Sequence, residues 1–260
     1  MDILHSRIVG EGKSLLILHG YFGMGDNWKS HANKLASEGF QVHLIDQRNH
    51  GRSFHSDEFD YEFLVEDLVN YIRYYSIEKP HILGHSMGGK TAMLFAVKYP
   101  DLLDKMVVVD ISPRAYPPHH HEILRALNSV DFKIQGSRKL VDDKLSELIT
   151  EVGVRQFLLK SVYWKEKGLL DFRFNLKSLT ENNQEVGVGL PSFTSYEGQV
   201  LFLSGEQSKY ITAEDIPLIE AHFPKAIIKQ IPNAGHWLHA ENPDDFFLSL
   251  IDFINSTDNF

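Results

Sequence analysis

The chain has 260 residues, 43% of them hydrophobic, so it is long enough to bury a sizeable core as one domain with an insertion. Its formal net charge is -9 and its basic residues are scattered, which argues against nucleic acid as a partner. It contains no cysteine, which excludes a disulfide framework and a thiol nucleophile. No apolar stretch reaches the roughly 18 residues that span a membrane, and residues 1–12 do not resemble a secretory signal, so we expect a cytoplasmic protein.

Short apolar runs and amphipathic segments alternate along most of the chain. The runs that predict six buried parallel strands are residues 15–18, 40–45, 81–83, 106–109, 200–203 and 226–231. The segments with helical periodicity are residues 28–38, 61–75, 90–98, 213–222 and 243–254. The last helix has Asn242 as its N-cap and Pro243 at its first position. This alternation predicts an α/β fold with a doubly wound, mostly parallel sheet.

Residues 112–198 separate two predicted strands by far more than one crossover helix requires. Within this stretch, residues 122–128, 138–151 and 154–165 have helical patterns. We therefore expect a core of residues 1–111 and 199–260, and an inserted helical cap or lid of residues 112–198. A segment that leaves from strand ends lies where open α/β sheets bind ligands. The alternative is a helical bundle with no role in substrate binding.

The motif Gly-His-Ser-Met-Gly at residues 84–88 lies between a predicted strand and a predicted helix. This strand, turn and helix context is that of a nucleophile elbow, and it makes Ser86 the candidate nucleophile. The helix that follows directs its free N–H groups toward Ser86, so the Met87 amide is a candidate donor to an oxyanion. Because the motif also occurs by chance in ordinary loops, the assignment depends on finding partners for Ser86.

A serine nucleophile needs a base, and the base needs an acid that orients it. His236 follows the last predicted strand, at the sheet edge that carries Ser86, and is the candidate base. Ser208 occupies the position where this arrangement commonly has its aspartate, and Glu206 lies nearby. Asp110 follows the strand after the Ser86 helix and preserves the chain order Ser, Asp, His. We assign Asp110 as the acid, with Glu206 as second choice and a turn cap as the other reading of Asp110.

The loop after the first core strand reads His-Gly-Tyr-Phe-Gly at residues 19–23. An oxyanion hole takes its second amide from this loop, and we expect that amide to be the Tyr21 N–H, with Phe22 lining the acyl site. The aromatic residues Phe157 and Trp164 of the insertion indicate an apolar acyl or alcohol site, although aromatics at helical spacing also form lid cores. We expect the Ser208 hydroxyl to bond near the Asp110–His236 pair and include it among the substrate-site residues.

Five motifs carry a resemblance to a known family. They are residues 19–23, 46–53, 84–90, 156–161 and 235–241. Over essentially its whole length the chain resembles the α/β-hydrolase superfamily, and most closely the small bacterial esterases of the YbfF type. The resemblance implies the α/β-hydrolase fold with a helical cap, no cofactor, and carboxylesterase activity on short or medium acyl esters or thioesters. It also implies an acid after the sixth strand of the fold and a serine at the usual acid position, as Asp110 and Ser208 have here.

Other chemistries of the same triad stay open, namely thioesterase, lactonase, carbon–carbon bond hydrolase and perhydrolase, and so does a ligand-binding pseudoenzyme. Serine at position 86 excludes chemistry through a carboxylate nucleophile. A metal site at residues 119–121 (His-His-His) is disfavoured because consecutive residues do not easily face one ion. Asp46 and Arg48 are expected to organise a loop near the site. The expected partner is a small-molecule ester or thioester, and the expected state is a monomer or small homo-oligomer.

Overall fold

A computed structural model describes residues 2–118 and 120–256. The strands are β1 (Ser6–Val9), β2 (Lys13–Leu18), β3 (Phe40–Ile45), β4 (His81–His85), β5 (Lys105–Val109), β6 (Val162–Glu166), β7 (Leu169–Phe172), β8 (Gln199–Gly205) and β9 (Ala226–Ile231). The α-helices are α1 (Lys29–Ser37), α2 (Tyr61–Tyr74), α3 (Met87–Lys98), α4 (His121–Asn128), α5 (Arg138–Ser146), α6 (Val152–Leu159), α7 (Leu176–Glu181), α8 (Ile216–His222), α9 (Leu238–Glu241) and α10 (Pro243–Asn255). Short 3₁₀ helices are η1 (Gly25–Trp28), η2 (Pro100–Leu102), η3 (Glu185–Gly187) and η4 (Ala213–Asp215).

The central sheet has seven strands in the order β1-β3-β2-β4-β5-β8-β9. All neighbouring strands are parallel except β1, which runs antiparallel to β3 at one edge. The strand order reverses between β3 and β4, which makes the sheet doubly wound, and the predicted fold class is confirmed. Because β2, β4, β5 and β8 are parallel, their carboxyl ends meet at one edge of the sheet, where ligands bind in open α/β folds.

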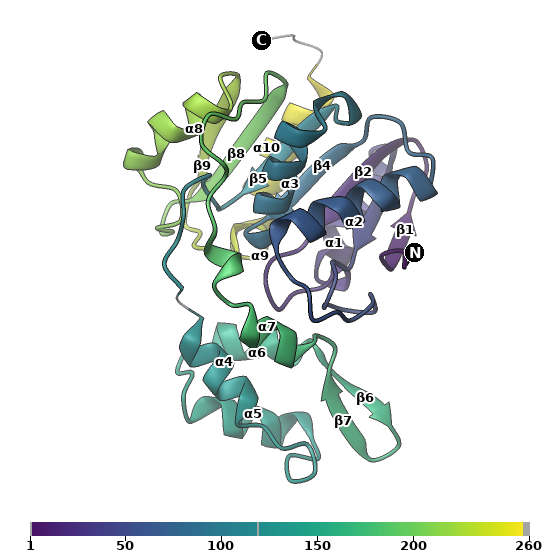
Figure 1. Cartoon of the computed structure of the whole chain (residues 1–260), viewed down its shortest axis with the longest axis vertical. Coiled ribbons are helices and arrows are strands. Elements are labelled where there is room, and N and C mark those ends of the chain that lie inside the picture. The colour runs from purple at the N-terminus through teal and green to yellow at the C-terminus, as the bar shows by residue number, and fades with distance from the viewer. Residues whose placement is uncertain (1, 119, 257–260) are drawn as a thin grey trace.

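Helices cover both faces of this sheet (Figure 1). On one face, Trp28 and Phe246 are fully buried with side chains from the sheet and from α1 and α10. On the other face, α2, α3 and α8 cover the strands, and Phe95 of α3 and Phe202 of β8 lie in that core. The five inner strands are mostly buried on both faces, which explains their nearly continuous apolar sequences. The prediction that residues 226–231 form a buried strand is wrong as to burial, because β9 lies at the edge of the sheet.

The segment between β5 and β8 extends away from the sheet and carries α4 to α7 and the β6–β7 hairpin (Figure 1). The prediction of one helix over residues 154–165 is wrong beyond Leu159, because the chain turns at Lys160 and continues as strand β6. The amides of Lys160 and Ser161 bond to carbonyls three residues back and close α6. Gly168, at φ 87°, supports the turn that follows β6.

Other elements also differ from the prediction. Helix α5 ends at Ser146 instead of residue 151, residues 213–222 form η4 followed by α8, and the four-residue edge strand β1 was not predicted. Strand β1 contains Arg7 and is only partly buried, so it lacks the apolar run of the inner strands. The predicted N-cap of the last helix is confirmed, since the Asn242 side chain accepts a hydrogen bond from the Asp245 amide.

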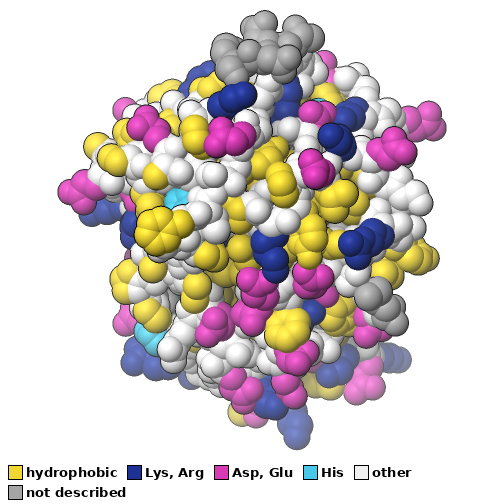
Figure 2. Space-filling view, turned by 45° about the horizontal axis from the view of Figure 1, so that its top comes forward, with side chains coloured by type: hydrophobic (Ala, Val, Ile, Leu, Met, Phe, Trp, Pro, Cys, Tyr) yellow, Lys and Arg dark blue, Asp and Glu magenta, His cyan; other side chains and the backbone are white. Residues whose placement is uncertain are grey.

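Charged side chains of both signs are interspersed over the face drawn in Figure 2. Across the sequence, 35 acidic residues stand against 26 basic ones. No helix in the ranges 2–118 and 120–256 combines the length and the hydropathy that crossing a membrane needs.

Several buried histidines make the stability depend on pH. Burial lowers the pKa of His43 to about 4, whereas an unfolded histidine titrates near 6.5. Between these values the unfolded chain binds more protons, so the free energy of unfolding falls as the pH drops from about 6.5 toward 4. We expect His43→Gln to reduce this loss. Urea unfolding at pH 7 and pH 5 measures the loss of unfolding free energy in the wild-type protein and in the variant. An equal loss in the two proteins would contradict the role of His43.

Candidate active site

Ser86 occupies a sharp turn between β4 and α3. Its backbone has φ 52° and ψ -115°, and its amide donates to the Val109 carbonyl oxygen at 2.9 Å. A Cβ atom on Gly84 would overlap the Gly88 carbonyl, and one on Gly88 would overlap the Leu18 carbonyl at the end of β2. Glycine at both positions therefore lets α3 start against the strand ends and holds Ser86 at the edge of the sheet.

Asp110 follows β5 and is completely buried, with a positive φ of 52°. Its carboxylate accepts three hydrogen bonds. The Gly205 amide reaches Oδ1 at 3.0 Å, while the Ser208 hydroxyl and His236 Nδ1 reach Oδ2 at 2.5 and 2.7 Å. These partners offset the cost of burying the carboxylate. The structure thus brings Asp110, Ser208 and His236 together from three different strand ends.

His236 lies in the loop between β9 and α9. Because its Nδ1 faces Asp110, Nε2 is the nitrogen left for a reacting group. The Tyr210 ring stacks on the imidazole at 4.1 Å between centroids, and His85 Nε2 donates to the His236 carbonyl oxygen at 2.9 Å. Burial, with a contribution from the nearby His236 charge, lowers the pKa of His85 to about 3. A neutral His85 therefore supports the main chain of His236.

The second-choice acid lies apart from this cluster. Glu206 Oε2 accepts a hydrogen bond from the Asn233 amide at 2.8 Å, so its side chain caps a turn between two strand ends. Ser208 donates its hydroxyl to Asp110 and does not line the cavity at Ser86; it lines a separate pocket together with Tyr210 and His236.

The loop after β2 passes directly over Ser86. A Cβ atom on Gly20 would lie 2.8 Å from His85 Nδ1 and 3.4 Å from the Ser86 Cβ. The Phe22 amide donates to His50 Nε2 at 3.2 Å, which leaves the Tyr21 amide as the candidate oxyanion donor of the two. The Tyr21 hydroxyl donates to the Leu179 carbonyl at 2.7 Å, and burial raises its pKa. Tyr21 is therefore fixed at its side-chain end by the inserted segment.

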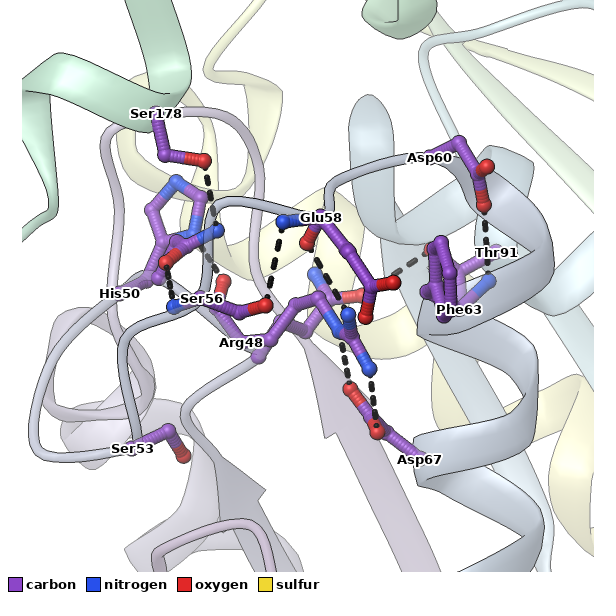
Figure 3. Close-up of polar contacts among 12 residues, drawn as sticks. Arg48, His50, Ser53, Ser56, Glu58, Asp60, Phe63, Asp67, Thr91 and Ser178 are labelled. Atoms are coloured by element: carbon purple, nitrogen blue, oxygen red, sulfur yellow. Dashed lines mark hydrogen bonds and ion pairs between the residues drawn. The ribbon is translucent and has the colours of Figure 1, made fainter. Parts of the chain in front are cut away.

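Figure 3 shows a polar network around Arg48, in the segment between β3 and α2. Arg48 makes a two-point ion pair with Asp67, at 2.6 and 2.8 Å, and both side chains are buried. The Arg48 carbonyl accepts from His50 Nδ1 at 2.9 Å, and burial keeps the pKa of His50 well below its ordinary value, so its Nε2 accepts from the Phe22 amide. The Asn49 side chain donates to Ser178 Oγ at 3.1 Å, which ties the same loop to α7.

A cavity of about 130 Å³ lies over Ser86 and His236. Phe22 lines it from the core, and Phe157 lines it from α6 of the inserted segment. The other lining residues that the insertion contributes are His120, Ile123, Val154 and Leu158. Trp164 is not brought to this cavity: it lies on β6 with 60% of its surface exposed, because the helix that was expected to carry it ends at Leu159.

Sequence reasoning missed His85, Tyr210, His50 and His120 as parts of the site. His85 was within the elbow motif and His50 within the motif of residues 46–53, but neither pattern indicates the groups that they bind.

The histidine run at residues 119–121, which was disfavoured as a metal site, is only partly described. His119 lies outside the described residues, and the His120 ring packs on Tyr21 at 5.0 Å between centroids. Within residues 2–118 and 120–256, no cluster of three or more histidine or carboxylate side chains has the arrangement of a metal site.

Known proteins share this arrangement of elements. The family model for the alpha/beta hydrolase fold matches residues 13–146. The zebrafish (Danio rerio) protein named sn-1-specific diacylglycerol lipase ABHD11 is 40% identical over 253 residues, covering 94% of this chain and 79% of that protein. Esterase YbfF of Escherichia coli strain K12 is 33% identical, covering 93% and 92%. The solved structure of a marine microorganism esterase superposes with a TM-score of 0.94 at 44% identity, covering 97% of this chain and 100% of that one.

The close approach at Gly88 can be tested by one methyl group. We expect Gly88→Ala to lower the free energy of unfolding by about 1–3 kcal/mol, because the added Cβ collides with the Leu18 and His19 carbonyls. Gly136→Ala is the matched control, since a Cβ there meets no atom within 4 Å. Urea unfolding compares the two, and equal stability of both variants would contradict the tight approach.

Proposed function

We propose that this chain, which belongs to the α/β-hydrolase family, hydrolyses carboxylic esters through an acyl-enzyme on Ser86. The proposal starts from its being an enzyme of the esterase and lipase type. The observation that carries the proposal is that Ser86 and His236 line one cavity and that His236 Nδ1 lies 2.7 Å from the buried Asp110 carboxylate. Nucleophile, base and acid come from three strand ends, in the chain order that this fold uses.

The residues have distinct roles in the proposed reaction. Ser86 Oγ attacks the ester carbonyl carbon while His236 Nε2 takes its proton. The same nitrogen then gives that proton to the departing alcohol oxygen as the carbon–oxygen bond breaks. Water, deprotonated by His236, attacks the acyl-enzyme and releases the acid. Asp110 holds the imidazole in the tautomer with Nδ1–H and stabilises the imidazolium that forms in each step.

The amides of Met87 and Tyr21 are the proposed oxyanion donors. The Met87 amide begins α3, where the helix N-terminus favours negative charge. The network from Asp67 through Arg48 and His50 to the Phe22 amide supports the loop that carries Tyr21. Donors fixed before the reaction stabilise the developing charge without reorganisation during the step.

The proposed substrate has a small or medium acyl group. Apolar side chains of the insertion and Phe22 wall the cavity over Ser86, and its volume of about 130 Å³ suits a compact chain. Ester cleavage is favoured over thioester cleavage because the relatives reported above carry the names esterase and lipase. Phe22 and Phe157 are the proposed acyl contacts, and Ser208 is a positioning residue for Asp110.

The nucleophile is tested by Ser86→Ala. We expect kcat for p-nitrophenyl butyrate to fall by about 10⁶-fold, because no other group in the cavity replaces the attacking oxygen. A spectrophotometric assay with active-site titration measures the loss. Ser192→Ala, in an exposed segment, is the control and is expected to keep wild-type turnover. Wild-type turnover by the Ser86→Ala variant would show that Ser86 is not the nucleophile.

The acid is tested by a pair of carboxylate substitutions. We expect Asp110→Asn to lower kcat by about 10³ to 10⁴, because an asparagine favours the wrong tautomer of His236. Glu206→Gln is the matched control, since the Glu206 side chain accepts from the Asn233 amide. Measured kcat values with p-nitrophenyl butyrate decide between the two carboxylates. A large loss from Glu206→Gln alone would make Glu206 the acid in place of Asp110.

A further inference from the structure

One face of the His236 imidazole is covered by the ring of Tyr210, which lies in the loop between β8 and η4. The two ring centroids are 4.1 Å apart, and the ring planes differ by 23°. The other rings near this imidazole are tilted further, His85 at 4.7 Å and 40° and Trp237 at 5.8 Å and 61°. Of the rings in the described part of the chain, Tyr210 therefore makes the closest and most nearly parallel contact with the candidate base.

The hydrogen bond to Asp110 fixes one atom of the imidazole but not the plane of the ring. Nδ1 of His236 lies 2.7 Å from the carboxylate, and a hydrogen bond tolerates bending by about 30°. Nε2 is on the far side of the same ring, so a tilt displaces it, and a displacement of about 1 Å is enough to slow an enzymatic step. The face contact with Tyr210 supplies a second restraint, because stacked rings resist a tilt of either one.

Tyr210 is itself held by hydrogen bonds of its main chain. Its amide donates to Ser208 Oγ at 3.2 Å, and the Ser208 hydroxyl donates to the Asp110 carboxylate. Its carbonyl oxygen accepts from the Tyr116 hydroxyl, which in turn accepts from the Ser112 amide at 2.9 Å. Both connections lead back to the end of β5, since Ser112 is two residues after Asp110. The ring that covers the base and the carboxylate that orients it are therefore placed by one connected set of hydrogen bonds.

The face of the Tyr210 ring suits a cation. Burial, together with the nearby Asp110 charge, raises the pKa of Tyr210 to about 12, so the side chain is a neutral phenol at pH 7. The face of such a ring carries partial negative charge and attracts a cation within about 6 Å of its centroid. The His236 ring lies inside that distance. The contact is therefore more favourable for the imidazolium of the proposed reaction than for the neutral imidazole.

The same ring stands between the imidazole and a second pocket. Tyr210 and His236 line both the cavity over Ser86, of about 130 Å³, and this second pocket, of about 490 Å³. Charged side chains, Arg114 and Lys209, are among the other residues that line the second pocket. A side chain without the ring at position 210 would leave the imidazole, and its bond to the acid, open to water from that side.

We infer that Tyr210 is a positioning residue of the proposed reaction, which holds the plane of the His236 imidazole, and thereby Nε2, and stabilises the imidazolium that forms there. The inference rests on the proposed ester hydrolysis. Tyr210 acts through His236 and not on the ester. Because Tyr210 also lines the cavity over Ser86, the competing role is that of a wall for the substrate. Kinetics distinguish the two roles.

Replacing the ring by an aliphatic side chain tests this role. We expect Tyr210→Leu to lower kcat for p-nitrophenyl butyrate by about tenfold, from the lost contact with the imidazolium. KM should change by less than about twofold, because formation and hydrolysis of the acyl-enzyme both use His236. Tyr210→Phe keeps the ring and should stay within about threefold of the wild-type kcat. Tyr74→Leu makes the same change at an exposed position of α2 and should keep wild-type kcat.

Two kinetic results would overturn the inference. A raised KM with unchanged kcat in Tyr210→Leu would make Tyr210 a wall for the substrate. An equal fall of kcat in Tyr210→Phe and Tyr210→Leu would assign the effect to the hydroxyl and not to the ring. If Tyr210→Leu does not fold, Tyr210→Met carries the same expectations, because it also removes the ring face.

Proton NMR of the Ser86→Ala variant needs no turnover and separates this inference from the proposed reaction. The Nδ1 proton between His236 and Asp110 should give a low-field resonance, which His236→Gln assigns by its loss. We expect added Tyr210→Leu to broaden this resonance beyond detection through exchange with water, and added Tyr210→Phe to retain it. If the wild-type protein cleaves no ester while this difference appears, the proposed reaction fails and the positioning of His236 by Tyr210 stands. If esters are cleaved and Tyr210→Leu changes neither kcat nor the resonance, the inference on Tyr210 fails alone.

Discussion

The whole site depends on how closely the start of α3 approaches the ends of β2 and β4. Glycine at positions 84 and 88 allows this approach, because a side chain at either would overlap a backbone carbonyl. The approach places the Ser86 amide on the Val109 carbonyl at the end of β5, one residue before Asp110. Ser86 and Asp110 are therefore set by adjacent strands of one sheet, and their separation is fixed by backbone hydrogen bonds.

The charge balance of the site follows from burial. Asp110 is the buried anion, and it is offset by three donors that include His236. Burial holds the pKa of His85 at about 3 and lowers that of His239, so the rings next to His236 do not compete with it for a proton. In the proposed reaction, a positive charge that forms on His236 has the Asp110 carboxylate as its close counter-charge, which favours proton transfer to and from this histidine.

The sequence was most informative where local pattern and tertiary structure agree. Five inner strands, the helix N-cap at Asn242 and the resemblance to α/β hydrolases and YbfF-type esterases are confirmed. The sixth predicted strand is present as β9, but it lies at an edge of the sheet and is largely unburied. The insertion was harder, because the apolar pattern of α6 continues through Ser161 into β6, and only hydrogen bonding at the helix end separates them. Contacts such as Tyr210 on His236 join residues 26 positions apart, and no local pattern encodes such a pairing.

Helix α3 binds the insertion at the points where the chain leaves and rejoins the core. Lys90, one turn after Ser86, is almost fully buried, and its Nζ donates to the carbonyls of Pro113, Arg114 and Val188. The first two lie where the chain leaves the core and the third where it returns. The charged form of Lys90 has three N–H groups, which match the three acceptors, and burial lowers its pKa to about 7. Displacing the insertion at these points breaks charge-assisted hydrogen bonds, so the elbow helix that presents Ser86 also fixes the base of the segment that walls its cavities.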